Sequence, residues 1–182
     1  MRRWPLVAAS LLAALVTAAA ARGAGVTVNS TVSGGSTLTV TSQNSPSFPD
    51  TLTGDDQTAS YQAQLQVVDA RGLASGGGWN LTITSTQYSD GAGHTLPTNA
   101  STITSVSDSC HSGSTCATPQ NNVPNAGIAL PVSPTTTPIL NAATGSGLGR
   151  IDVAVNVRVG IPANTIAATY TSTLTVAIAA GP

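Results

Sequence analysis

Cys110, His111 and Cys116 lie in one short stretch, and their side chains can do chemistry. Two cysteines this close in an exported chain indicate a disulfide. Because the loop it closes is short, the loss of chain entropy in the unfolded state would make this disulfide stabilising by about 2 kcal/mol. The alternative is a metal site made by these three residues and His94. No second Cys-x-x-Cys arm exists, and adjacent ligands point poorly toward one ion. We therefore predict a Cys110–Cys116 disulfide, no metal and no cofactor.

Catalytic groups are sparse elsewhere. A glycosidase needs two carboxylates that flank a cleft, but all acidic residues here are aspartates, and most lie in turn-like contexts. A hydrolytic triad needs a serine with a histidine and an aspartate, whereas His94 and His111 both lie in polar stretches and no Gly-x-Ser-x-Gly elbow is present. No phosphate-cradling or dinucleotide-binding loop occurs. The sequence predicts a protein that is not an enzyme.

Trp79, Asn80 and Leu81 open an alternating segment after a run of glycines. An exposed Trp79 could stack on the apolar face of a sugar ring, with Asn80 bonding to its hydroxyls. Alternatively, Trp79, Leu81 and Ile83 share one face of a strand, which would make the tryptophan a core anchor. The sequence leaves both interpretations open.

The N-terminus has the layout of a secretory signal peptide. Arg2 and Arg3 precede an apolar run over 6–21 that ends in small residues. We assign 1–24 to this signal and 25–182 to one mature domain, and expect no membrane span after cleavage. Six basic residues face seven acidic ones without forming a cluster, which argues against nucleic acid or anionic membrane as a partner.

Alternation with period two positions these residues on strands. It is strictest over 61–67 and over 152–159, and Leu174, Val176 and Ile178 share one face of a last strand. Weaker candidates are 26–28 and 38–40. The chain is predicted to be all-β, an antiparallel sandwich, immunoglobulin-like or barrel-like. Proline and small polar residues fill 107–149, which we predict to be a long loop insertion, with pieces such as 127–132 pairing with a sheet.

Several motifs in this order resemble the WxL domain family. Leu65 to Gly72 resembles the family strand that ends in an Asp-x-Arg-Gly turn, and Trp79-Asn80-Leu81 follows it. The segment 161–165 resembles the one before the last family strand, and 170–175 resembles the start of the closing motif. The family has a second tryptophan in that motif, where this chain has Val176. In the turn itself we expect Gly72 at positive φ and a local Asp69–Arg71 contact.

The resemblance implies a secreted protein of the bacterial cell surface that attaches non-covalently to the cell wall. It implies peptidoglycan as the ligand, with other surface proteins as further partners. On this basis the candidate peptidoglycan-binding residues are Trp79, Asn80, Leu81, Tyr170 and Leu174. The alternative is a structural subunit of an extracellular fibre or coat, because uncharged, threonine-rich strands also suit assembly by strand pairing.

Overall fold

The two longest strands are those whose sequences alternate most strictly. The computed structural model describes residues 30–31, 33, 35–72 and 77–181. In it, β2 (Gln57–Asp69) and β7 (Gly149–Ile161) pair antiparallel along their whole length. Valines 153, 155, 157 and 159 are buried, as are Ala63, Leu65 and Val67, while Gln62 and Gln64 are exposed. The predicted alternation is therefore confirmed in both strands.

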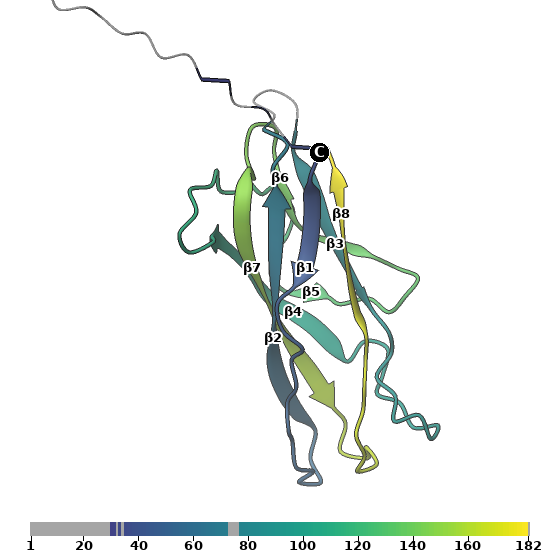
Figure 1. Ribbon diagram of the computed structural model, residues 1–182. Helices are drawn as coiled ribbons and strands as arrows, with labels where there is room; N and C mark the ends of the chain where they lie inside the picture. The colour runs from purple at the N-terminus through teal and green to yellow at the C-terminus, as the bar shows by residue number, and fades with distance from the viewer. Residues whose placement is uncertain (1–29, 32, 34, 73–76, 182) are drawn as a thin grey trace, which may run out of the picture. The chain divides into compact units, whose positions relative to one another are not determined.

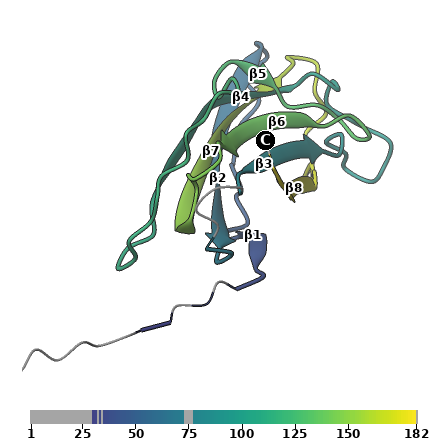
Figure 2. The same ribbon diagram turned by 90° about the horizontal axis from the view of Figure 1, so that it is seen from above.

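Two antiparallel sheets build the fold (Figure 1). Sheet A has the order β1-β2-β7-β4-β5 and adds β1 (Leu38–Ser42), β4 (Ser101–Cys110) and β5 (Ile128–Ala129). Sheet B has the order β6-β3-β8, with β6 (Thr137–Ala142), β3 (Trp79–Ser85) and β8 (Leu174–Ala180). Figure 2 shows the β6-β3-β8 layer beside the β2-β7 layer. The predicted antiparallel sandwich is confirmed.

The sandwich is not closed into a barrel. The strands β1 and β8 are the facing edges of the two sheets, and no ladder joins them among the described residues. Between the sheets lies one apolar core that takes side chains from both layers, including Val67, Leu81, Ile103, Ile139 and Val155. Each of these side chains is fully buried. Consequently the two edges are held near one another by the core and not by backbone pairing.

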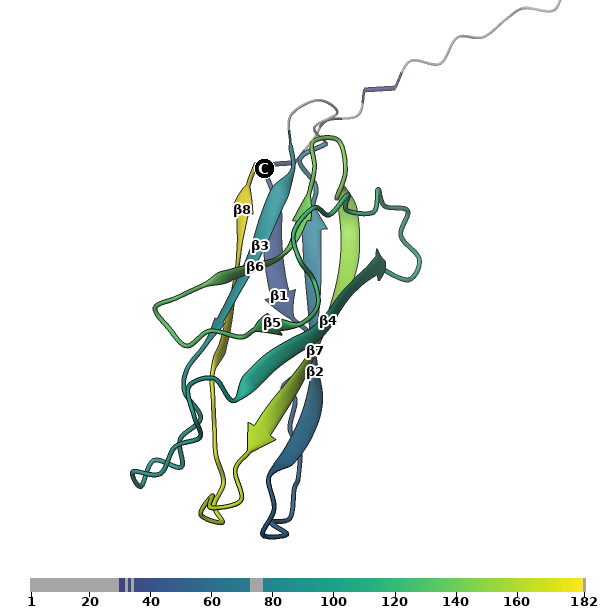
Figure 3. The same cartoon turned by 180° about the vertical axis from the view of Figure 1, so that it is seen from behind.

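The stretch 107–149 contributes more to the sandwich than a loop insertion would. As predicted, its piece 127–132 pairs with a sheet, because β5 joins β4 (Figure 3). However, β6 is a full strand of sheet B, and Ile139, Leu140 and Ala142 are buried in the core. The period-two pattern is absent from β6, because Ile139 and Leu140, which follow Pro138, are both buried. The ladder between β3 and β6 accommodates them by a register shift between Leu81 and Thr82.

The expectations for the N-terminal part concern residues outside the described ones. These are the signal peptide over 1–24 and the strand candidate over 26–28. Of the two strand candidates before residue 50, the structure describes the second, which is β1. Within the described part of the chain, no helix has the length and apolar character needed to cross a membrane.

Candidate functional site

Trp79 is a core residue. Its side chain is fully buried, and the indole Nε1–H donates a hydrogen bond of 3.0 Å to the carbonyl oxygen of Gly147. Gly147 has φ of +72°, and a Cβ at this position would collide with Ala142 and with the indole ring. Glycine is needed here both for its backbone conformation and for the close approach of the ring. Of the two interpretations that the sequence left open, the structure therefore shows the core anchor.

Asn80 and Leu81 differ in exposure because successive side chains of a strand point to opposite faces. Leu81 is fully buried beside Trp79. Asn80 is half-buried, and its Nδ2 donates to the carbonyl oxygen of Gly181. The backbone N–H of Gly181 in turn donates to Gly78 O at 3.0 Å. Asn80 thus secures the end of β8 to the start of β3.

Tyr170 and Leu174 lie at the other end of the same sheet. Trp79 pairs with Ala180, whereas Leu174 pairs with Ser85. Six residue steps along β8 separate the two pairs, which is about 20 Å. The five candidate residues therefore form two groups, with Trp79, Asn80 and Leu81 at one end of β3 and the other two at its far end. Their role in peptidoglycan binding stays a prediction.

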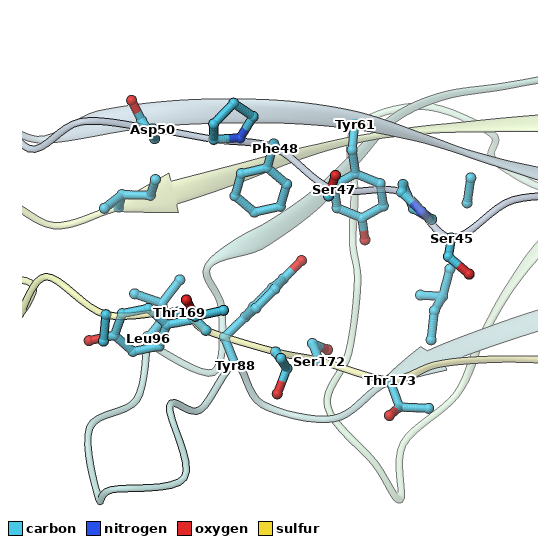
Figure 4. Close-up of a pocket in the computed structure, with 18 of the residues that line it drawn as sticks. Ser45, Ser47, Phe48, Asp50, Tyr61, Tyr88, Leu96, Thr169, Ser172 and Thr173 are labelled. Atoms are coloured by element: carbon cyan, nitrogen blue, oxygen red, sulfur yellow. The ribbon is translucent and has the colours of Figure 1, made fainter.

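Tyr170 and Leu174 line a groove between the two sheet edges, which we call the edge groove. It has a volume of about 1060 Å³. One wall is the chain over 44–52, which follows β1, and the facing wall is the chain over 165–174, which leads into β8. In Figure 4, Phe48 and Tyr61 from one side and Tyr88 from the other point into the space between these walls.

The tyrosines and the phenylalanine of the chain gather in this groove. The sequence has three tyrosines and one phenylalanine, and all four line it: Phe48, Tyr61, Tyr88 and Tyr170. The rings of Phe48 and Tyr61 are stacked with centroids 5.8 Å apart, and Tyr88 meets Phe48 edge-on at 6.3 Å. All four side chains are half-buried, so the rings pack together and still present surface to the groove.

Burial raises the pKa of the Tyr61 hydroxyl, and the nearby Tyr88 raises it further. Burial also raises the pKa of Tyr88. Both hydroxyls therefore remain neutral donors and acceptors near neutral pH. Among the described residues that line the edge groove, Asp50 is the one with a charged side chain. The groove is thus a nearly uncharged surface of aromatic rings, hydroxyls and backbone groups, which is the composition of sites for neutral polar ligands.

The Asp-x-Arg-Gly turn serves stability. Asp69 is buried and accepts hydrogen bonds from Arg71 Nε at 2.9 Å and Nη2 at 2.8 Å. Although burial opposes ionisation, these bonds hold the pKa of Asp69 below its usual value. Arg71 Nη2 also donates to Gly78 O, and Gly72 has φ of +67°. The predicted contact and the positive φ are confirmed, and the pair is more buried than a surface turn would make it.

The cysteines form the predicted disulfide, Cys110–Cys116. The two histidines have separate partners. His111 Nδ1 lies 2.9 Å from Asp152 Oδ2, and His94 Nδ1 lies 2.6 Å from Asp90 Oδ2. Within the described ranges no group of three or more metal-binding side chains is brought together. The hydrogen bond from Gln66, followed by the contact with His111, lowers the pKa of Asp152.

Sequence reasoning identified Tyr170 and Leu174 but not the rest of the edge groove. Phe48, Tyr61 and Tyr88 are far apart in sequence, and Tyr61 has the alternation of an ordinary core residue. One signal was available in the sequence, because the two prolines within 44–49 favour a turn or a sheet edge. Nothing in the sequence shows that the chain over 165–174 faces this segment across the groove.

One comparison with known proteins gives a match. The family model described as WxL domain surface cell wall-binding matches residues 28–182. Comparison with curated proteins and with solved structures yields no match. The matched range includes every strand described above, both groups of candidate residues and the edge groove.

Proposed function

Because the chain belongs to the WxL family of surface domains that bind the cell wall, we propose that its ligand there is peptidoglycan and that it binds without catalysis. Membership in the family already places the protein at the cell surface, attached to the wall. Export through a signal peptide over 1–24 completes the proposal. The observation that carries it is the match over 28–182, and the edge groove supplies a surface of suitable chemistry.

The edge groove suits a glycan strand. Aromatic rings offer flat faces with a negative π surface, against which the C–H face of a sugar can pack. Serine and threonine hydroxyls on both walls, among them Ser47, Thr169 and Ser172, can bond to sugar hydroxyls. Tyr170 and Leu174 would contact the ligand directly. Trp79, Asn80 and Leu81 would contribute by holding the core and the β3–β8 pairing.

The lack of paired acids in the groove supports the non-catalytic part. Glycoside hydrolysis uses two carboxylates on opposite sides of the bond that is broken. The described lining of the groove has the Asp50 carboxylate alone, and Asp90 is engaged by His94 outside it. Such a groove can bind the ligand, but its described lining has no pair of carboxylates to serve as acid and base.

The direct test is sedimentation of the purified protein with cell-wall sacculi, before and after removal of the polymers attached by phosphodiester bonds. We expect the protein to pellet with both preparations. Pelleting with untreated walls alone would assign the ligand to another wall polymer and would refute the peptidoglycan proposal. Release of soluble sugar fragments above the buffer control would refute its non-catalytic part.

Two variants localise the contact. Tyr170→Ala should weaken retention on sacculi about tenfold, as expected for an aromatic contact worth about 1.4 kcal/mol. Thr175→Ala is the matched control, because Thr175 is an exposed residue of β8 on the face turned away from the core. Equal retention of both variants and the wild type would exclude the edge groove as the contact surface.

A further inference from the structure

The first wall of the edge groove is a backbone edge without a partner. The chain leaves β1 still attached to β2, because Gln43 N–H donates to Gln64 O at 2.8 Å and the Asn44 side chain bonds to the backbone of Gln62 and Gln64. After Asn44 the backbone attachment to β2 ends, and it resumes at Thr51, whose carbonyl oxygen accepts from the Gln57 side chain at 2.8 Å. The backbone of Ser45 to Asp50 makes no hydrogen bond to any described residue. Pro46 and Pro49 have no N–H to offer, but their carbonyl oxygens are free to accept.

The second wall is also an edge. Thr171 exchanges two backbone hydrogen bonds with Ser89, and Thr86 N–H donates to Thr173 O. Backbone groups of successive residues in an extended chain point to opposite sides. Ser172 therefore directs its N–H and C=O away from the 86–89 segment, toward the groove. The N–H groups of 167–170 likewise have no partner among the described residues.

Apolar surface accompanies these edges. Of the described residues, two large hydrophobic side chains are exposed: Leu52, at 36%, and Ile166, at 53%. They lie on opposite walls of the groove. Unpaired backbone on both walls, an aromatic floor and apolar side chains at the rim are the features that receive an extended polypeptide by strand addition.

The chain itself contains a segment that matches this groove. Residues 26–32 are Val-Thr-Val-Asn-Ser-Thr-Val, with valines on one face at 26, 28 and 32 and no charge, proline or glycine. Seven extended residues span about 23 Å, and the wall from Ser45 to Asp50 spans about 20 Å. An uncharged segment suits a groove with a single charged side chain. Ser30 and Thr31 within this segment and Ser33 after it are exposed.

The segment is too short to fill the groove of its own molecule. Gly35 N–H donates to Ala70 O and Ala70 N–H to Thr37 O, so the chain enters β1 beside the end of β2. The groove begins near Leu65, which is five residues, about 17 Å, from Ala70 along β2. The nine residue steps from Gly35 back to Val26 span about 30 Å, so about 13 Å of chain would remain to cover a wall of about 20 Å.

We propose that residues 26–32 of one copy of this chain lie in the edge groove of a second copy as an added strand. Donor segment and acceptor groove are different surfaces, so each copy can both give and receive a strand. Such a head-to-tail contact builds a ring or an open chain of subunits, depending on whether the rotation between copies closes. This inference goes beyond wall attachment and also bears on it, because a groove filled by a neighbour cannot hold glycan.

A peptide experiment tests the contact. The acceptor is the full exported chain with Val26→Asp and Val28→Asp. These charges prevent its own donor segment from entering a groove, and both positions lie outside the described strands. A labelled peptide of residues 25–33 should bind it saturably in fluorescence anisotropy, and the same peptide with both aspartates at least tenfold more weakly. Equal binding of the two peptides, or none, overturns the proposal.

Groove specificity and self-assembly are checked with two bulky substitutions. Ala168→Trp fills the groove from its second wall, and Thr175→Trp puts the same bulk on the opposite face of β8. In sedimentation velocity the wild type and Thr175→Trp should associate as concentration rises, while Ala168→Trp and the double aspartate variant stay monomeric. A wild type that is monomeric throughout overturns the proposal.

Wall binding is measured separately on the double aspartate variant, whose groove is open. If it pellets with sacculi but binds no peptide, the assembly proposal fails and wall attachment stands. If it binds the peptide but not the sacculi, the reverse holds.

Discussion

The two ends of β3 show aromatic residues in opposite situations. At the start of β3, Trp79 is fully buried and its indole N–H is bonded to Gly147. Beyond its end, Phe48, Tyr61, Tyr88 and Tyr170 are half-buried around an open groove, and the Ser172 backbone beside them has no partner within the described part of the chain. In the first arrangement the ring and its N–H are used within the molecule, whereas the second leaves surface and hydrogen-bonding groups for a ligand. Stability and binding should therefore be separable by mutation.

The largest expected effect is at the closed end. Trp79→Ala should lower the free energy of unfolding by about 3–5 kcal/mol, because it leaves a cavity and an unpaired Gly147 carbonyl. Urea denaturation measures this loss. Trp79→Phe keeps most of the volume and should cost less. Since Trp79 is remote from the edge groove, the fraction that remains folded should bind sacculi like the wild type. A loss of binding without a loss of stability would contradict the assignment of stability to one end of β3 and binding to the other.

Gly147→Ala tests the same contact from its other side. A Cβ here would collide with Ala142 and the Trp79 ring, and the residue has positive φ. Strain and overpacking together should cost about 2–4 kcal/mol. Gly113→Ala is the control, because Gly113 also has positive φ but open space around it, and should cost about 1 kcal/mol. Equal melting temperatures of the two variants would show that the close approach of the ring is unimportant.

The buried Asp69–Arg71 pair gives a smaller, pH-dependent effect. Asp69→Asn should cost about 1–3 kcal/mol at pH 7. Because the folded pKa of Asp69 is lowered, its stabilisation is complete above the unfolded value of about 3.9 and is lost as pH falls through the folded value. The gap in unfolding free energy between wild type and variant should therefore narrow below pH 4. A gap that is constant from pH 7 to pH 3 would exclude this origin. Asp55→Asn, at an exposed position, is the control.

The smallest stability effect is expected at the open end. Tyr170 is half-buried and its hydroxyl donates to Ile166 O in the same exposed wall. Tyr170→Ala should lower the free energy of unfolding by about 1 kcal/mol or less, while its binding to sacculi falls about tenfold. Thermal melting checks the first number. A loss of stability as large as that of Trp79→Ala would remove the distinction between the two ends.

The sequence predicts the fold well where neighbouring residues decide the structure. Alternation in β2 and β7 reflects one buried and one solvated face, and the Asp69–Arg71 turn is local. The strand β6 was missed because Ile139 and Leu140 are both buried beside a register shift, which removes the period-two signal. The edge groove was largely missed because it depends on which strand edges face one another. That is decided by sheet order, and no local pattern encodes it.

The link between Asn80 and Gly181 has a practical consequence for engineering. Gly181 is bonded to both Asn80 and Gly78 at the Trp79 end of sheet B. A fluorescent reporter or enzyme fused at this end of β8 would be attached about 23 Å, the length of β8, from the end of the strand that borders the groove. The domain could then serve as a display scaffold whose cargo and ligand occupy opposite ends.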